Sequence, residues 1–288
     1  MDTVTVKRMT HYLVIQGDEI ATPDLKQLAK LAGASRIDAI DQQTFHLPGA
    51  DIASKTVVAA HCEKAQLDFG FVPQTRKLSD FGLAVMDMDS TLITIECIDE
   101  IADLMGLKPQ VSAITESTMR GEIDFRESLC RRVALLAGLP ESALERVYAE
   151  RLKLSPGAET MLAGFKTGGI RTLLVSGGFT FFTERLKTRL GLDYTASNVL
   201  EIIDGKLTGK VLGDIVDADA KAAWLVQIRD ALGLAPAQVI AIGDGANDLK
   251  MLAAAGVSIA YRAKPVVRGQ ADYALNFVGL DGVLNLLG

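Results

Sequence analysis

From about residue 81 onward, short apolar runs alternate with longer amphipathic segments. Continuous apolar runs of this length are typical of strands that are buried on both faces of a parallel sheet, and the helical segments between them suit right-handed crossovers. The pattern predicts an α/β fold with a doubly wound parallel sheet, in which ligands bind at the carboxyl ends of the strands. The runs are Leu83–Met86, Ile170–Val175, Val239–Ile242, Val257–Ala260 and Tyr273–Leu275.

The segment between the first two runs has no strand-like pattern. Residues 98–154 are predicted to form four helices, one of which begins after Asp124, with Glu127 three residues later completing a capping box. Because these helices are inserted directly after the first strand, we expect them to cover the strand ends as a cap. Further along, the pair Asp204 and Gly205 between strand-like residues predicts a hairpin.

The first 75 residues show a different pattern, which predicts a small α+β domain. Its order of strand, helix, strand, strand, helix and strand is ferredoxin-like, and it resembles the ACT-type ligand-sensing domains in topology. We therefore divide the chain into residues 1–75, expected to regulate or dimerise the protein, and residues 76–288, with Pro73–Asp80 as the linker. The expected strands are His11–Gln16, Arg36–Asp41, Thr44–Leu47 and Leu67–Val72, and the expected helices are Thr22–Ala32 and Ile52–Lys64.

Charge and cysteine content narrow the classes of function. The formal net charge is -6, from 30 Lys and Arg against 36 Asp and Glu. Nucleic acids and anionic membranes require a basic face, so neither is expected as a partner. Three cysteines without a CxxC pair favour a reducing compartment, and no apolar segment reaches the ~18 residues of a membrane span. The expectation is a soluble cytoplasmic protein. Cys97 and Cys130 are predicted to be packed in the core.

Carboxylates follow two of the apolar runs. Asp87 and Asp89 come directly after the first run, and Asp244 and Asp248 directly after the third. Since the carboxyl ends of neighbouring parallel strands meet at one edge, these four groups are expected to lie together, where their repulsion requires a cation. Carboxylate and carbonyl oxygens are the ligands that magnesium prefers, so a magnesium site is predicted. Asn247 is expected to cap the helix that follows.

The second run is followed by Ser176 and two glycines, a combination that can bind an anion through a hydroxyl and exposed backbone N–H groups at a strand-to-helix turn. A nucleophilic serine would need a base, usually histidine. The three histidines all lie in the first 75 residues, so chemistry of the serine-triad type is not expected. Lys221, before the third run, is the candidate cation for a bound phosphate.

These motifs, DMDST, VSGG, DAKA and GDGAND in this order, resemble those of the haloacid dehalogenase-like phosphatases over residues 81–288. The resemblance implies that Asp87 is the nucleophile of an aspartyl-phosphate mechanism and that Asp89 is the general acid and then the base. At a reference pKa of about 3.9, Asp87 would be ionised at pH 7. The resemblance further implies that Lys221, Ser176 and Gly177 hold the phosphoryl oxygens, with Asn247 beside them.

The same resemblance implies a magnesium site and a substrate. The metal ligands would be Asp87, Asp244 and the main-chain carbonyl of Met88, or that of Asp89 instead, with Asp248 supporting the site. Finer features, including Glu96 and the cap segment MRGEIDFRESLCRRVALLAGLP, are similar to those of family members that hydrolyse free O-phospho-L-serine, the last step of serine biosynthesis. Glu96 and Arg132 would then bind the amino acid part of this small-molecule substrate, in a pocket lined by Met119 and Phe125.

Alternatives remain open from the residues themselves. Arg126, Arg131 and Arg132 could form one solvated helix face, and Met119 and Phe125 could be core residues of the cap. Another phosphatase or a phosphotransferase acting on a different small phosphomonoester is the main alternative function, because fold does not determine substrate. A dehalogenase is disfavoured by Asp89, since a halide leaving group needs no proton. A non-catalytic sensor is disfavoured by the intact set of carboxylates and lysine.

Overall fold

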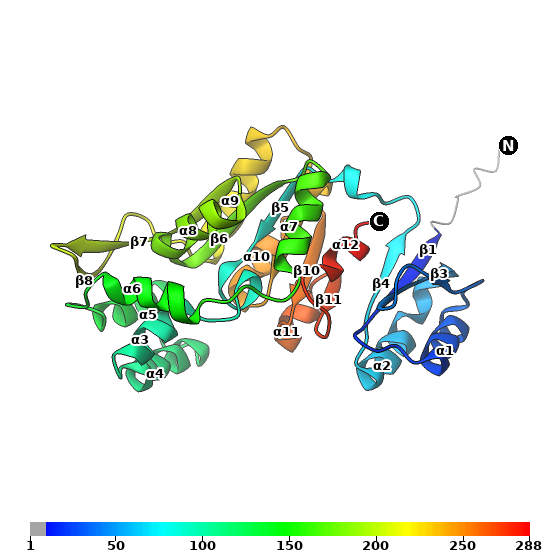
Figure 1. The fold of residues 1–288 in the computed structure, drawn as a ribbon, viewed down its shortest axis with the longest axis horizontal. Helices are drawn as coiled ribbons and strands as arrows, with labels where there is room; N and C mark the ends of the chain where they lie inside the picture. Colours follow the sequence, from blue (N-terminus) through cyan, green and yellow to red (C-terminus); the bar gives the residue numbers. More distant parts are fainter. Residues whose placement is uncertain (1–9) are drawn as a thin grey trace.

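The computed structural model describes residues 10–288, in which the strands form one mixed sheet (Figure 1). The strand order is β2-β3-β1-β4-β11-β10-β9-β5-β6-β7-β8. The middle of the sheet is parallel, and the chain leaves β5 first toward β6 and β7 and later toward β9, β10 and β11. Strand β5 is therefore the switch point of a doubly wound sheet. The bounds are β5 Leu83–Met86, β6 Arg171–Phe179, β7 Tyr194–Ile203, β9 Val239–Gly243, β10 Val257–Tyr261 and β11 Tyr273–Leu275.

Helices cover both faces of this parallel region, as predicted. All four residues of β5 have no exposed surface, and they alternate between two apolar clusters. Leu83 and Val85 belong to the cluster under α9, α10 and α11, whereas Ala84 and Met86 belong to the cluster under α7, α8 and α12. The helices are α7 Ala158–Thr167, α8 Thr180–Leu190, α9 Ala218–Ala231, α10 Leu249–Ala253, α11 Pro265–Arg268 and α12 Gly282–Asn285.

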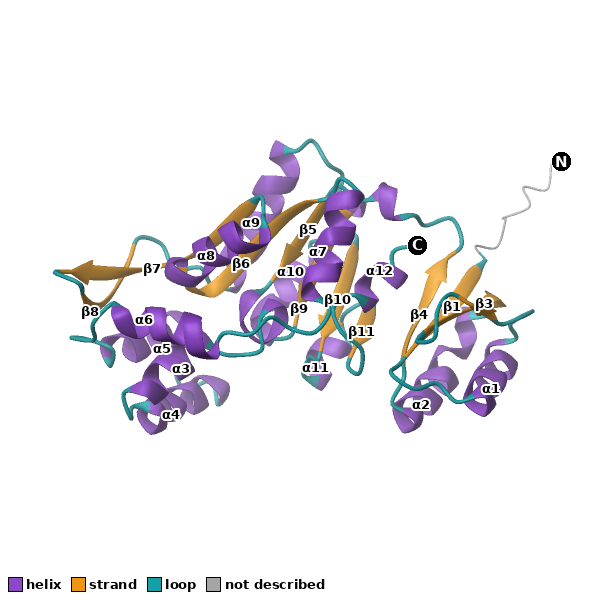
Figure 2. Ribbon diagram, viewed as in Figure 1, coloured by secondary structure: helices purple, strands orange, loops and turns teal. Residues whose placement is uncertain are grey.

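The predicted cap is a group of four helices beside the β7–β8 end of the sheet (Figure 2). Asp124 begins one of them by accepting the backbone N–H of Glu127 at 2.8 Å. The cap's apolar residues join the cluster that contains Met86, so cap and sheet share one core. The helices are α3 Cys97–Leu104, α4 Lys108–Met119, α5 Phe125–Ala134 and α6 Ser142–Arg146, which continues as a helical turn over Val147–Arg151.

The predicted hairpin connects the cap to the sheet. Strand β8, Lys206–Leu212, pairs with β7 across a turn in which Asp204 and Gly205 both have positive φ, 50° and 70°. The backbone of β8 also bonds to the cap, because the Gly138 N–H donates to the Leu207 carbonyl at 2.7 Å. The hairpin therefore holds the cap at the edge of the sheet.

The N-terminal unit has the predicted ferredoxin-like order. Its antiparallel strands and the helices α1 and α2 enclose a separate apolar core, which includes Leu13, Leu28 and Leu47. The second strand is shorter than predicted, with two residues in place of 36–41. The bounds are β1 His11–Gln16, α1 Thr22–Ala32, β2 Asp38–Ala39, β3 Thr44–Ala50, α2 Lys55–Ala65 and β4 Asp68–Pro73.

One feature of this unit was not predicted: its sheet continues into the parallel sheet. Strand β4 pairs antiparallel with β11 at Phe69 and Ala274. The buried carboxylate of Asp68 accepts the backbone N–H groups of residues 276–278 at 2.8–3.0 Å. The joint is therefore made by the sheet as well as by the expected linker. Among residues 10–288, no helix is long and apolar enough to cross a membrane.

Candidate active site

Three carboxylates and one lysine meet at the carboxyl ends of β5 and β9. Lys221, fully buried in the first turns of α9, donates to Asp87 Oδ1 at 2.5 Å and to Asp248 Oδ1 at 2.7 Å. Burial alone would lower the pKa of Lys221, but the Asp248 and Asp87 carboxylates raise it above its ordinary value. The ammonium group is therefore retained, and it connects the DMDST and GDGAND motifs.

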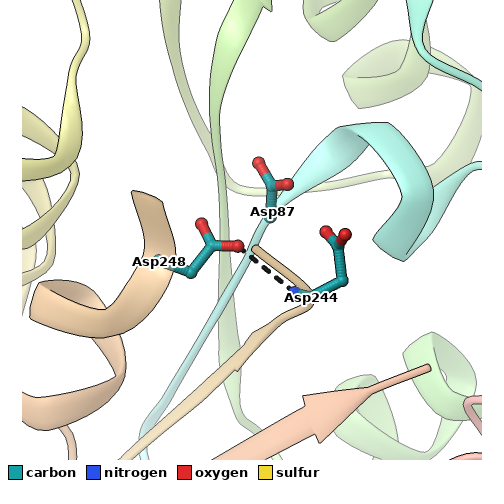
Figure 3. Close-up of side chains that lie close together, drawn as sticks. All are labelled: Asp87, Asp244 and Asp248. Atoms are coloured by element: carbon teal, nitrogen blue, oxygen red, sulfur yellow. Dashed lines mark hydrogen bonds between the residues drawn. The ribbon is translucent and has the colours of Figure 1, made fainter. Parts of the chain in front are cut away.

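One carboxylate oxygen from each of Asp87, Asp244 and Asp248 lies within 4.8 Å of the other two (Figure 3). Burial and then the Asp248 charge hold the pKa of Asp87 well above its ordinary value, and the same two causes raise the pKa of Asp244 to about 6. One ammonium thus faces three carboxylates in a buried position. This donor set fits a hard divalent cation, which would relieve the remaining repulsion. Burial therefore opposes ionisation of Asp87, an effect that its reference pKa does not include, whereas Lys221 and a bound cation would favour ionisation.

Asp89 lies beside this cluster in a different environment. Its Oδ1 accepts the backbone N–H of Cys97 at 3.1 Å. Burial, followed by the neighbouring Glu96 carboxylate, raises the pKa of Asp89 to about 7. A carboxyl group of this kind is partly protonated near neutral pH, so it can both donate and accept a proton.

Ser176 and the two glycines after it lie at the same edge, although not in the predicted turn. Strand β6 runs on through Phe179 and α8 begins at Thr180, so the prediction that the strand ends at Val175 was wrong. Ser176 Oγ accepts the N–H of Gly178 at 2.8 Å. A side chain at Gly178 would come within 2.9 Å of Asp89 Oδ2, so any larger residue here would displace that carboxylate.

The cap closes the site with residues from α3 and α5. Glu96, at the start of α3, accepts the Ser90 hydroxyl at 2.7 Å, and burial raises its pKa. Arg132 is half-buried, and Phe125 lies so close to Gly177 that a Cβ there would meet its ring at 3.0 Å. The side chain of Met119 lies outside the part of the chain that the structure describes.

The three arginines of α5 do not form one solvated face. Arg126 donates to Asp217 at the start of α9 at 2.8 Å, which joins the cap to the sheet domain. Arg131 pairs with Glu127 at the surface. Arg132 instead lines a cavity of about 780 Å³. The cavity is shared by both parts of the site, and its lining includes Asp87, Asp89, Glu96, Phe125, Gly177, Asp244 and Asn247.

Comparisons with known proteins identify the family of this chain. A model of the haloacid dehalogenase-like hydrolase family matches residues 84–253. The chain belongs to the haloacid dehalogenase-like hydrolases. A domain of unknown function, DUF4072, matches residues 13–56.

Several relatives of this hydrolase carry the name phosphoserine phosphatase. The protein of that name from Polaromonas sp. strain JS666 is 55% identical over 216 residues, covering 73% of this chain and 92% of its own. The structure of a probable phosphoserine phosphatase from Vibrio cholerae is 38% identical, with a TM-score of 0.84, and covers 97% of this chain and 86% of its own. A substrate-bound phosphoserine phosphatase complex is 38% identical, with a TM-score of 0.68 over 72% of this chain and 99% of its own.

Two details of this hydrolase differ from the sequence interpretation. Asn247 does not cap a helix; instead the Asp248 carboxylate accepts the N–H groups of Asp244 and Gly245 at 3.2 and 3.0 Å. Cys130 is exposed, although core packing was predicted for it, whereas Cys97 is buried.

The hydrolase site also contains residues that the sequence analysis did not select. Thr91 donates to Asp244 Oδ1 at 3.1 Å, and Ser90 holds Glu96. Both belong to the DMDST motif, so their position next to Asp89 was an available signal. Asp217 offered no such signal, because an acidic residue before a helix is common as a cap.

Proposed function

We infer that this haloacid dehalogenase-like hydrolase is a phosphoserine phosphatase, which hydrolyses O-phospho-L-serine to L-serine and phosphate in the last step of serine biosynthesis. One observation carries the inference. Asp87 and Asp89 share a single cavity with Glu96 and Arg132, so a nucleophile and an acid face a pair of charges suited to an amino acid. The relatives that carry this name are similar over most of the chain.

In the first step, Asp87 attacks phosphorus, so that a bond forms between its Oδ and phosphorus while the bond to the serine oxygen breaks. The leaving alkoxide takes a proton from Asp89, whose raised pKa keeps part of the group protonated near pH 7. In the second step, Asp89 accepts a proton from water, which attacks the phosphoaspartate and releases phosphate. Dividing the displacement in this way replaces one high barrier with two lower ones.

The residues that hold the phosphoryl group surround Asp87. Lys221 is within hydrogen-bonding distance of the Asp87 carboxylate, so its charge lies where the phosphoryl oxygens develop negative charge. We assign Ser176 and Gly177 to the same task with Asn247 beside them; of these, Gly177 and Asn247 line the cavity.

We assign magnesium to Asp87 and Asp244, with Asp248 supporting the site and one main-chain carbonyl completing the protein ligands. Between the two candidate carbonyls we favour Asp89, because the Met88 carbonyl already accepts the N–H of Ile93 at 3.0 Å. When bound, magnesium would screen the repulsion between the Asp87 carboxylate and the phosphate dianion.

Substrate choice rests on the cap. Arg132 can bind the serine carboxylate through two parallel hydrogen bonds, and Glu96 can pair with the ammonium group. Both charges of the substrate would then be met in a closed site, where an unpaired charge is costly. Phe125 and Met119 are assigned to the walls of this pocket.

The test is phosphate release from O-phospho-L-serine, phosphothreonine, a sugar phosphate and p-nitrophenyl phosphate, each with magnesium and with EDTA. We expect fast release that depends on magnesium and is selective for phosphoserine, and Asp87→Asn should abolish it while the fold is kept. Release mainly from the other esters would retain the chemistry and reject the substrate. No release from any ester would reject the function.

We also propose that residues 1–75 form a regulatory or dimerising unit and that the enzyme acts in the cytoplasm. The unit carries exposed apolar side chains next to its free edge strand, Ile37 at 36% and Ile40 at 53% exposure. Light scattering on the full chain should give a homodimer that Ile37→Lys with Ile40→Lys dissociates. A wild-type monomer whose activity does not respond to serine would reject this role. Cell fractionation tests the compartment.

A further inference from the structure

A buried asparagine outside the sequence motifs lies behind the phosphoryl-binding segment. Asn198, in β7, has no exposed surface. Its Nδ2 donates to the carbonyl oxygen of Gly177 at 2.8 Å, and its Oδ1 accepts the N–H of Val216 at 2.8 Å. A carbonyl can only accept and an N–H can only donate, so these partners determine which way the amide points.

The segment that Asn198 contacts lacks the usual support of a sheet. Strands β6 and β7 pair regularly up to Val175 opposite Ala196, and the pairing resumes at Phe179 opposite Asn198. Between these points the ladder is interrupted, and the chain contains Gly177 and Gly178. Two consecutive glycines have large conformational freedom. The Asn198 side chain therefore supplies the hydrogen bond that a regular ladder would otherwise give to the Gly177 carbonyl.

Holding this carbonyl also orients the Ser176 hydroxyl. The Gly177 carbonyl and the Gly178 N–H belong to one planar peptide group, so fixing the oxygen fixes the direction of the N–H. That N–H donates to Ser176 Oγ at 2.8 Å. Because Ser176 Oγ accepts this bond, its own proton is left to donate to a different acceptor, which in the proposed function is a phosphoryl oxygen. Successive hydrogen bonds of this kind polarise one another in the same direction.

The other end of the amide fixes the start of α9. Val216 precedes Asp217, whose side chain caps α9 by accepting the Ala220 N–H at 3.0 Å. The Lys221 backbone N–H donates to the Asp217 carbonyl at 2.9 Å. One buried side chain therefore connects the segment of Ser176 to the helix of Lys221.

We propose that Asn198 is a positioning residue for phosphoryl transfer, which holds the Ser176–Gly178 segment in register with α9. This inference rests on the proposed phosphatase function and deepens it. Asn198 does not line the cavity, so it acts through Ser176, Gly178 and Lys221. It should affect binding of the phosphoryl group and leave recognition of the amino acid part to Glu96 and Arg132.

The experiment compares full-length wild type, Asn198→Ala and Asn198→Asp with the control Asn285→Ala. Asn285 also donates from a partly buried amide, to Gln16 at 2.8 Å and Thr44 at 3.2 Å, but at the joint with the N-terminal unit and outside the cavity lining. The readouts are kcat, the inhibition constants of inorganic phosphate and of L-serine, and Tm. Loss of a donor to a reacting oxyanion costs about 10²–10³ in kcat, and misorientation should cost less.

For Asn198→Ala we expect kcat to fall roughly 10–100-fold and the inhibition constant of phosphate to rise about fivefold or more, with that of serine within about twofold. Asn198→Asp keeps the acceptor for Val216 and, assayed at a pH high enough to ionise the new carboxyl group, cannot donate to Gly177, so it should then show the same split even if Asn198→Ala folds poorly. Asn285→Ala should lower Tm and keep kcat. Folded variants with unchanged kcat, or with both inhibition constants raised equally, would overturn the proposal.

Wild-type turnover separates this proposal from the proposed function. If wild type hydrolyses a different phosphomonoester, the substrate assignment fails, and the same variants are then compared on that ester through kcat and phosphate inhibition. A lower kcat together with weaker phosphate inhibition in Asn198→Asp would still support the positioning role, and unchanged values of both would reject it.

Discussion

Replacing Gly178 with alanine should separate activity from stability. The new Cβ would lie 2.8 Å from Met88 Cε, 2.9 Å from Asp89 Oδ2 and 3.0 Å from Ser176 Oγ. Since Gly178 does not have the left-handed backbone that favours glycine, the cost lies in these contacts. Each of the three atoms is at or near the end of a side chain, so it can move aside cheaply. Two of them belong to groups whose position the reaction requires.

The expected losses of activity and stability follow from how far the new Cβ displaces its neighbours. Ordinary contact begins near 3.4 Å, so the Asp89 carboxylate must retreat by about half an ångström, and a misplacement of ~1 Å can cost ~10² in rate. We expect kcat for phosphoserine to fall roughly 10–100-fold, about 1.4–2.7 kcal/mol in activation free energy. The free energy of unfolding should fall by only about 1 kcal/mol, at the low end of the range for overpacking.

Steady-state kinetics and urea unfolding measure the two effects on the same protein. The matched control is Gly164→Ala in α7, where a Cβ would lie 2.6 Å from Leu284 Cδ1, remote from the site. It should lose comparable stability and keep kcat. If Gly178→Ala keeps kcat within about threefold of wild type, or loses activity only in proportion to unfolding, the assignment of Asp89 as the acid and of Ser176 as a phosphoryl-binding group would be contradicted.

Three further predictions concern pH, substrate and the joint between units. Without metal, Asp89 and Asp244 have pKa values of about 7 and about 6, above the unfolded value of about 3.9. Between the unfolded and the folded pKa values the folded protein therefore binds more protons, so in EDTA its urea-unfolding free energy should fall by roughly 4 kcal/mol from pH 5 to pH 8, and magnesium should restore it. Equal stability at both pH values would refute this. Arg132→Lys should lower kcat/KM for phosphoserine about 10–100-fold and leave that for p-nitrophenyl phosphate nearly unchanged, because a lysine cannot form the two parallel hydrogen bonds to a carboxylate. Equal losses on both substrates would argue against Arg132 as the group that binds the serine carboxylate. Asp68→Ala should lower the free energy of unfolding in urea by about 3 kcal/mol or more without changing kcat, because the N–H groups of residues 276–278 lose a buried partner. An unchanged unfolding midpoint would show that water replaces the carboxylate.

Local patterns predicted the elements of the fold well. The apolar runs before Asp87 and Asp244 are buried on both faces, and this burial is why they are continuous. The Asp204-Gly205 turn was predictable because its positive φ values favour these residue types. The grouping of carboxylates was predictable from topology, since the ends of neighbouring parallel strands share an edge.

The sequence predictions were wrong where residues have only a weak conformational preference. The glycines after Ser176 have no strong preference for strand or turn, so the extension of β6 to Phe179 depends on its neighbour β7. Asn247 is a plausible cap by residue type, but α10 has no side-chain cap, and the neighbouring Asp248 carboxylate accepts the Asp244 and Gly245 N–H groups of the preceding loop.

The sequence by itself determined the fold class, the order of elements, the cap and the residues available for catalysis. These follow from the period of apolar positions and from turn chemistry, which act over a few residues along the chain. Only the tertiary structure decided which groups meet: Lys221 with Asp87, 134 positions apart, Arg126 with Asp217, and β4 with β11. It also decided that Asn198 lies behind Gly177 and that burial raises the pKa of Asp87. Such pairings and their low-dielectric surroundings exist only after the sheet has assembled, because no local pattern records which distant segment will lie alongside.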